Sequence, residues 1–295
     1  MIEAHSKEWH EQRKKGIGGS ESAAVLGENS ERTPYEVWLD KTSDAIKTDE
    51  ENEVMLWGRL MEPLIINQYS TKTGRKVYNP GWACMEKYPF VCGNVDGLTD
   101  DRVVEAKAPI RFYEEPPKEY ILQCQHYMML HNRFLADIVW LNPYHKLCIT
   151  TIEADPELQE IMLKIYVKFW HGVETRTPPD CITLADVAKK YPFDNGDTVE
   201  LSTEAQDKLK EILTLKSKIA TLEAAIAADE LFVKKEMGEN QIGLNATGGI
   251  AVTWKTSKPR MTVDTARLKE DGLYDQYLKQ GSTSRTFIIK EKING

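Results

Sequence analysis

Apolar residues recur at helical spacing over residues 58–74, a pattern that predicts an amphipathic helix. The side that we expect to be buried carries Trp57, Leu60, Met61, Leu64 and Ile65. Pro63 lies inside this helix, where it removes a backbone donor and clashes with the carbonyl four residues earlier. We expect a kink there that directs the neighbouring Glu62 out of the packed face.

Residues 90–110 contain two strand-like runs around the turn-prone segment Leu-Thr-Asp-Asp, which predicts an antiparallel hairpin. If the loop centres on the two aspartates of that segment, Asp96 lies opposite Glu105 and Asn94 lies opposite Lys107. Directly opposed side chains stand roughly 4.5–5.5 Å apart at Cβ.

Strand alternation places Asp96, Glu105 and Lys107 on one face of the hairpin and turns Val104 and Ala106 toward the core. Two carboxylates that close repel each other, and without a cation one of them is driven toward protonation. The alternative is a hairpin whose acids face water, with Lys107 as a local counter-ion.

Residues 114–132 begin near two prolines and continue as good helix formers, so a helix is predicted. Tyr120, Gln123 and Tyr127 fall on one of its faces, at spacings i, i+3 and i+7. Taken alone, such a face is usually a polar edge.

The chain divides into a mixed α and β domain over residues 1–178, a linker over 179–202 and an extension over 203–295. Prolines and a turn-prone Asp-Asn-Gly segment indicate the linker. The extension ends in short strand-like runs (IAVTWK and RTFIIKEK) around a helix near residues 264–279.

A heptad pattern predicts a long helix at the start of the extension, with a stripe able to pack on one partner helix. The apolar positions of this stripe are Ile212, Leu215, Ile219, Leu222, Ile226 and Val233. Lys208 and Asp229 interrupt it at two expected apolar sites.

The composition, 41% hydrophobic and 28% charged, is that of an ordinary soluble protein. No apolar run is long enough to span a membrane and the first twenty residues are polar, so we expect a cytoplasmic location. The formal charge of −8 argues against indiscriminate DNA coating, because DNA affinity comes largely from phosphate contacts. Residues 241–295 nevertheless hold nine Lys/Arg against five Asp/Glu, so the acid is concentrated upstream, where a divalent metal could use it.

Five cysteines without Cys-x-x-Cys spacing and six scattered histidines predict neither a disulfide framework nor a zinc site. An iron–sulfur cluster is not expected either, because Cys148 and Cys181 do not form the downstream trio of cysteines that it requires.

The order of the acidic elements is more informative than each element alone. Asp-x8-Glu-x-Lys on a hairpin, with a helical Glu before it and a helical Gln after it, supplies the parts for phosphodiester hydrolysis. Carboxylates suit Mg²⁺, which polarises a scissile phosphate and generates hydroxide from bound water. Lys107 can orient or deprotonate that water and offset developing negative charge.

The sequence resembles the YqaJ-like viral recombinases, the lambda exonuclease family, in stretches that span about residues 9–175 in the family's order. These stretches are W-x3-R (Trp9, Arg13), GIGGSESAAVLG (16–27), TPYEVWLDKT (33–42), WGRLMEP (57–63), GNVDGL (93–98), VVEAKAP (103–109) and YILQCQHYM (120–128). In combination they are far more specific than a bare Glu-x-Lys.

The resemblance implies an α/β fold with a PD-(D/E)xK, restriction-endonuclease-like core, in which helices flank a central mixed β-sheet. Mg²⁺, with Mn²⁺ as a substitute, would be held by Glu62, Asp96 and Glu105. Lys107 would stand by the attacking water and Gln123 would complete the site, with Tyr120 and Tyr127 as supporting residues.

The resemblance also implies a phage or prophage enzyme that degrades one strand of duplex DNA from its 5′ end in a bacterial host. The remaining 3′ tail would pass to a single-strand annealing protein. A homo-oligomer is expected, since the lambda-type enzyme is a ring-shaped trimer, although the extension leaves this number open.

The N-terminal stretch has a physical logic of its own. Gly18 and Gly19 permit a tight turn, and Ser20 is then a good N-cap for a short helix that ends at Gly27. A helix N-terminus beside Arg13 is suited to an anion, and the resemblance assigns Arg13 and Ser20 to the DNA 5′-phosphate. Asn94 stands where the lambda-type enzyme has a phosphate-binding serine.

Two alternatives remain at this point. An endonuclease could have the same fold, because the motifs determine the chemistry and not where the enzyme enters DNA. A DNA-binding or assembly protein that has lost the reaction is less favoured, because all five catalytic positions are occupied by suitable residues.

Overall fold

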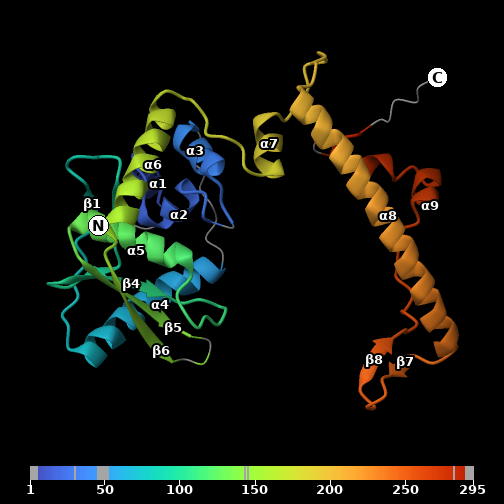
Figure 1. Ribbon diagram of the computed structural model, residues 1–295, viewed down its shortest axis with the longest axis horizontal. Coiled ribbons are helices and arrows are strands. Elements are labelled where there is room, and N and C mark those ends of the chain that lie inside the picture. The colour runs from blue at the N-terminus through green and yellow to red at the C-terminus, as the bar shows by residue number, and fades with distance from the viewer. Residues whose placement is uncertain are drawn as a thin grey trace. The chain divides into compact units, whose positions relative to one another are not determined.

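The computed structural model of the protein describes residues 6–29, 31–44, 53–142, 144, 146–281 and 283–289. Its internal contacts divide the chain into two units, Met1–Lys190 and Tyr191–Gly295 (Figure 1). We describe each unit by itself.

A four-stranded mixed sheet forms the centre of the first unit, in the order β3-β4-β5-β6. Its strands are β3 (Gly97–Leu98), β4 (Arg102–Lys107), β5 (Leu135–Leu141) and β6 (Leu147–Glu153). The central pair β4–β5 is parallel and the two outer pairs are antiparallel. A separate two-stranded sheet pairs β1 (Trp82–Cys84) with β2 (Cys92–Asn94).

Helices cover both faces of the central sheet. On one face, Ile65 and Tyr69 of α4 (Glu53–Thr73) pack against Val104 of β4. On the other, Cys124 and Met128 of α5 (Lys118–His131) pack against a cluster that includes Val103 and Ile138. Strand β4 is therefore buried on both sides, which explains its nearly continuous burial. The α/β fold class with a central mixed sheet flanked by helices is confirmed.

Helices from two parts of the first unit pack beside α5 and share a third cluster of buried residues. The helices that contribute to it are α2 (Ser22–Val25), which follows the 3₁₀ turn η1 (Gly19–Glu21), α3 (Pro34–Thr42) and α6 (Pro156–Glu174). Helix α1 (Lys7–Arg13) precedes them and has no buried residue. Helix α3 begins at a capping box in which Thr33 and Glu36 each bond the other's backbone N–H.

Helix α4 forms as expected, but its predicted buried side is wrong in part. Trp57, Leu60 and Leu64 are 61%, 45% and 60% exposed, whereas Ile65 and Tyr69 are the buried residues. The side that packs on the sheet follows the i, i+4 row through these two residues, so the stripe is rotated relative to the prediction.

The hairpin register agrees with the prediction near the turn. Gly97 pairs with Val104 and Leu98 with Val103, so Asp96 is next in line beside Glu105. The predicted pairing of Asn94 with Lys107 is wrong. Asn94 belongs to β2 and pairs with Trp82, because the chain passes from one sheet to the other at Val95 and Asp96.

The segment predicted as a linker, 179–202, is partly folded. Helix α7 (Leu184–Lys190) belongs to the first unit. Its Asp186 is fully buried and accepts hydrogen bonds from Thr33 Oγ1 at 2.7 Å and from the backbone N–H of Thr183 at 3.1 Å. This buried carboxylate, which no local pattern indicates, anchors the segment to the N-terminal helices.

The second unit contains a long helix, α8 (Thr203–Met237), capped by Ser202 at its start and ended by Gly238. A hairpin of β7 (Ile242–Leu244) and β8 (Ile250–Thr253) follows. The helix expected near 264–279 is shorter, because α9 covers Thr265–Glu270 and is followed by the 3₁₀ turn η2 (Asp275–Tyr277). Residues 285–289 of the last predicted strand-like run form no strand, and 290–292 lie outside the described residues. No helix in the described parts of the chain has the length and apolarity to cross a membrane.

Candidate functional site

Three side chains form a hydrogen-bonded cluster between β4 and α5. The Lys107 ammonium donates to Glu105 Oε1 at 2.6 Å and to Gln123 Oε1 at 3.0 Å. The Gln123 amide donates to the same Glu105 oxygen at 2.6 Å. Glu105 and Lys107 share one face of β4 because they are two residues apart, and α5 brings Gln123 over that face.

Asp96 is held beside this cluster by the backbone of β4. Its Oδ2 accepts a hydrogen bond of 2.8 Å from the N–H of Ala106, the residue between Glu105 and Lys107. Glu105 is only 1% exposed, and its second oxygen, Oε2, is buried without a hydrogen-bond partner. A buried carboxylate oxygen in this state is costly unless another group satisfies it.

The carboxylates at this point repel one another. Burial and the charges of Glu105 and Glu62 raise the pKa of Asp96 well above its usual range. Burial and then the charge of Glu105 raise the pKa of Glu62, a half-buried residue on α4. Burial favours a lower pKa for Lys107, but Glu105 and Asp96 outweigh it and the net pKa is raised.

The donor set suits a hard divalent cation. Among the described residues no three His, Cys, Asp or Glu side chains converge to enclose a metal ion. Mg²⁺ does not require such an enclosure, because one or two carboxylates, water and substrate phosphate complete its shell. The unpartnered Glu105 Oε2 and the repulsion at Asp96 would both be relieved by a cation, so these two residues fit the role, with Glu62 adding negative charge.

The two tyrosines of α5 play different parts. The ring of Tyr120 lies 5.1 Å from the Lys107 ammonium, a cation–π contact at the edge of the site. The Tyr127 hydroxyl donates to the backbone carbonyl of Asn94 at 2.9 Å. Its ring leaves no room for a side chain at Gly19 or Gly93, since a Cβ there would stand 2.5 Å and 2.7 Å from ring atoms. The Tyr127 ring therefore packs against both the N-terminal turn, at Gly19, and strand β2, at Gly93.

Arg13 and Ser20 meet, although not through the predicted cap. Ser20 lies in η1 and does not cap α2, whose N-cap is Glu21 without a side-chain bond. Instead, Arg13 Nη2 donates to Ser20 Oγ at 3.0 Å, and its guanidinium stacks 4.6 Å from the Trp9 ring. Ser20 is exposed, so an anion could reach both side chains. The side chain of Asn94 is also exposed.

A buried ion pair behind this surface was not predicted. Glu21 bonds the Lys41 ammonium at 2.7 Å, and both Arg13 and Arg32 lie 3.6 Å from Glu21 Oε1. Burial opposes ionisation of Glu21, but the three cations together hold its pKa at about 2. The four residues are spread over 29 positions of the sequence, so no short sequence pattern joins them. The short-range feature at Glu21 is its position three residues after Gly18, whose backbone N–H donates to it at 3.0 Å.

Comparison with known proteins finds a family that is similar to the first part of the chain. Residues 8–133 match the model of the YqaJ-like viral recombinase domain. The resemblance found in the sequence is thereby confirmed, and the matched range contains every proposed site residue from Arg13 to Gln123.

The similarity to one relative extends beyond residues 8–133. The chain is 26% identical to the uncharacterized protein YqaJ of Bacillus subtilis (strain 168) over 306 aligned residues, which cover 96% of this chain and 94% of that protein. The extension therefore has a counterpart in that relative.

Solved structures share the fold of a large part of this chain. The alkaline exonuclease LHK-Exo from Laribacter hongkongensis superposes with a TM-score of 0.52 at 24% identity, over 58% of this chain and 94% of the exonuclease. LHK-Exo in complex with dAMP gives a TM-score of 0.52 at 22% identity, over 63% and 97% of the two chains.

Proposed function

We propose that this protein is a Mg²⁺-dependent DNA nuclease that degrades linear duplex from the 5′ end and leaves 3′ tails for strand annealing. The observation that carries the proposal is the site around Glu105, where one buried carboxylate oxygen is unpartnered and the other bonds Lys107 and Gln123. Such a site combines ligands for a cation with a fixed positive charge beside it.

The proposed roles follow from the contacts. Asp96 and Glu105 would hold the metal ion, with Glu62 near it, and the bound ion would polarise the scissile phosphate and activate water. Lys107 keeps its proton because its pKa is raised, so it would offset charge that develops on the phosphate oxygens and orient the attacking water. Gln123 would hold the side chains of Lys107 and Glu105 in place through its hydrogen bonds with both.

The exonuclease mode rests on separate support. LHK-Exo, which shares the fold, is an alkaline exonuclease and has been observed with dAMP. Arg13 and the exposed Ser20 offer a guanidinium and a hydroxyl to a terminal phosphate. We propose Asn94 as a neighbour of that phosphate, a single-strand annealing protein as the recipient of the tail, and residues up to Lys190 as the catalytic domain.

A variant of Lys107 tests the chemistry. Lys107→Ala should retain binding of Mg²⁺ and DNA but lose turnover by roughly 10²–10³-fold, the usual loss when a donor that stabilises developing charge is removed. The matched control is Lys164→Ala, which removes a lysine that is 71% exposed on α6. Calorimetry and single-turnover kinetics separate the two properties, and near wild-type turnover for Lys107→Ala would refute the assignment.

The rate of degradation of duplexes with different 5′ ends distinguishes the proposed exonuclease from an endonuclease of the same fold. Duplex with a 5′-phosphate should be degraded faster than the 5′-hydroxyl form, and Arg13→Ala should erase the difference. Equal rates on both ends in the wild type, or rapid linearisation of a covalently closed circle, would favour the endonuclease.

A further inference from the structure

Helix α8 exposes an apolar stripe along its middle turns. Leu215, Ile219, Leu222 and Ile226 are 50%, 53%, 63% and 58% exposed. These positions alternate at spacings of four and three residues, so they lie on one side of a helix that is 35 residues long. A row of large apolar side chains this exposed usually marks an interaction surface.

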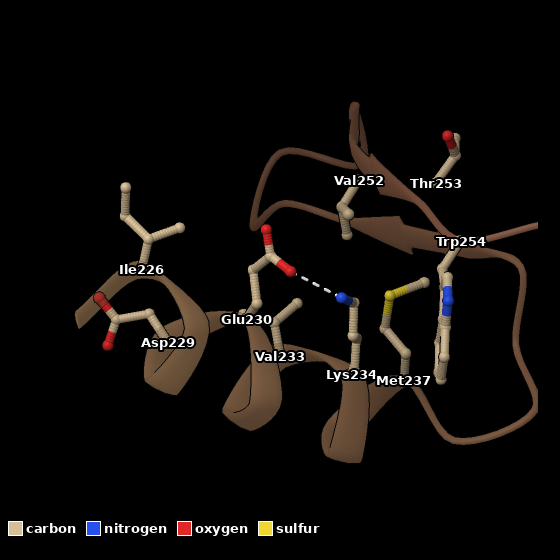
Figure 2. A pocket seen from close by; sticks show the side chains of 9 residues that line it. All are labelled: Ile226, Asp229, Glu230, Val233, Lys234, Met237, Val252, Thr253 and Trp254. Carbon is tan, nitrogen blue, oxygen red and sulfur yellow. Dashed lines mark hydrogen bonds and ion pairs between the residues drawn. The ribbon is translucent and has the colours of Figure 1, made fainter. Parts of the chain in front are cut away.

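The β7–β8 hairpin lies over the C-terminal end of this apolar stripe. Val233 and Met237 line a groove between α8 and the β7–β8 hairpin, with Val252 and Trp254 on the opposite wall (Figure 2). Met237 is 7% exposed, whereas Val233 is 41% exposed. The hairpin therefore faces the stripe from Ile226 onward and buries it at Met237, whereas Ile226 remains 58% exposed.

The residue types along the stripe indicate what covers the remainder. In the heptad notation, Ile212, Ile219 and Ile226 occupy the a positions, and Leu215 and Leu222 occupy the d positions. β-Branched residues at a with leucine at d favour a parallel pair of helices over higher orders.

Charges beside the stripe match when the helix is paired with itself. Glu211 and Lys218 occupy g positions, and Lys216 and Glu223 occupy the e positions five residues later. In a parallel pair, a g residue meets the following e residue of the other helix, which brings Glu211 to Lys216 and Lys218 to Glu223. Residues five apart do not face each other within one helix, so this complementarity has no use inside a single α8.

We propose that α8 pairs with α8 of a second copy of this chain as a parallel, two-stranded coiled coil over residues 212–226. The polar residues Lys208 and Asp229 stand at the d positions on either side and limit the apolar seam to that segment. A different protein partner would not require the g and e charges of this helix to complement each other.

The mass of the full-length chain tests the pairing. Multi-angle light scattering over a dilution series should show that Leu222→Glu halves the assembly mass, whether or not the first unit associates by itself. The control Ala224→Glu adds the same charge on the opposite side of the same turn and should leave the mass unchanged. A monomeric wild type, a mass unaffected by Leu222→Glu, or a reduction to one third would overturn the proposal.

Charge reversal tests the parallel orientation. Lys218→Glu should weaken association, because it places two glutamates together, and the double variant Lys218→Glu/Glu223→Lys should restore it. Circular dichroism verifies that α8 remains helical in each variant. If the double variant associates no better than the single one, the helices are not paired in this orientation and the proposal fails.

Discussion

Asp96 is a residue whose position is unfavourable without a cation. Burial and the charges of Glu105 and Glu62 raise its pKa, so its ionised form costs free energy in the metal-free protein at neutral pH. Asp96→Asn keeps an oxygen that can accept from the Ala106 N–H and removes the repulsion.

We therefore expect Asp96→Asn to abolish cleavage and yet raise the melting temperature in EDTA. Mg²⁺ should stabilise the wild type, by about 2.7 kcal/mol at a hundredfold excess over its dissociation constant, and should leave the variant unchanged. Thermal unfolding with and without Mg²⁺ measures both effects. A variant that is less stable than the wild type in EDTA would contradict the proposed repulsion.

Glu21 is the opposite case, because its ionised form is stabilised. Its pKa is lowered from 4.5 to about 2 by Lys41, Arg13 and Arg32, against the effect of burial. A carboxylate with a depressed pKa contributes stability above its unfolded pKa and loses that contribution as the pH falls through the folded value. The contribution should therefore be complete at neutral pH and decline below about pH 4.5.

Glu21→Gln should destabilise the protein at pH 7 by about 3–5 kcal/mol, because it leaves the buried Lys41 without its charged partner. Urea unfolding from pH 7 to pH 3 should show the difference from wild type narrowing as Glu21 becomes protonated. A difference that stays constant with pH would show that the carboxylate charge is not its cause.

At the scale of single residues, the sequence predicts which side chains lie together when they belong to one strand or one hairpin. Glu105 and Lys107 follow from strand alternation, and Asp96 follows from the hairpin register. The ion pair of Glu21 and Lys41 is not predictable in this way, because it depends on how α3 packs against the N-terminal turn.

At the scale of elements, close packing of η1 and β2 against α5 positions the N-terminal turn. A Cβ on Gly19 would stand 2.5 Å from the Tyr127 ring, whereas Gly58, inside α4, has open space around it. Gly19→Ala should therefore destabilise the protein by about 1–3 kcal/mol through overpacking. Gly58→Ala should stabilise it by about 0.5–1 kcal/mol, because alanine loses less backbone entropy in a helix. Denaturant unfolding compares the two, and equal effects would contradict this packing.

The helices and strands themselves were largely predictable, but their packed faces were not always so. The apolar residues of α4 lie around more than one side of the helix, and only the contact with β4 and β5 selects Ile65 and Tyr69. Strand alternation does not predict the pairing of Asn94, because the change from one sheet to the other leaves no trace in that pattern.

At the scale of the whole molecule, the three clusters of buried residues that form the core all lie in the first unit. Deletion of Tyr191–Gly295 should therefore leave metal-dependent cleavage intact while weakening assembly, DNA binding or both. Light scattering and the salt dependence of DNA affinity test this on the truncated and full-length chains. If the truncated chain is folded and matches the full chain in mass per assembly, affinity and salt slope, the extension serves neither purpose.

The boundary between the units illustrates a limit of sequence patterns. Prolines and turn residues predict a linker over 179–202, whereas α7 within that range belongs to the first unit. There Asp186 accepts a hydrogen bond from Thr33, which lies 153 residues earlier. Contacts of that separation have no periodic signature.

We propose above all that the carboxylates around Glu105 support DNA hydrolysis by a divalent cation. The most direct measurement is the release of nucleotides from end-labelled linear duplex by the full-length protein in Mg²⁺, in Mn²⁺, in Ca²⁺ and in EDTA. We predict cleavage with Mg²⁺ or Mn²⁺ and none with EDTA or with Ca²⁺ alone, because Ca²⁺ accepts longer and looser coordination. Robust cleavage in EDTA, or no cleavage in either Mg²⁺ or Mn²⁺, would contradict the account.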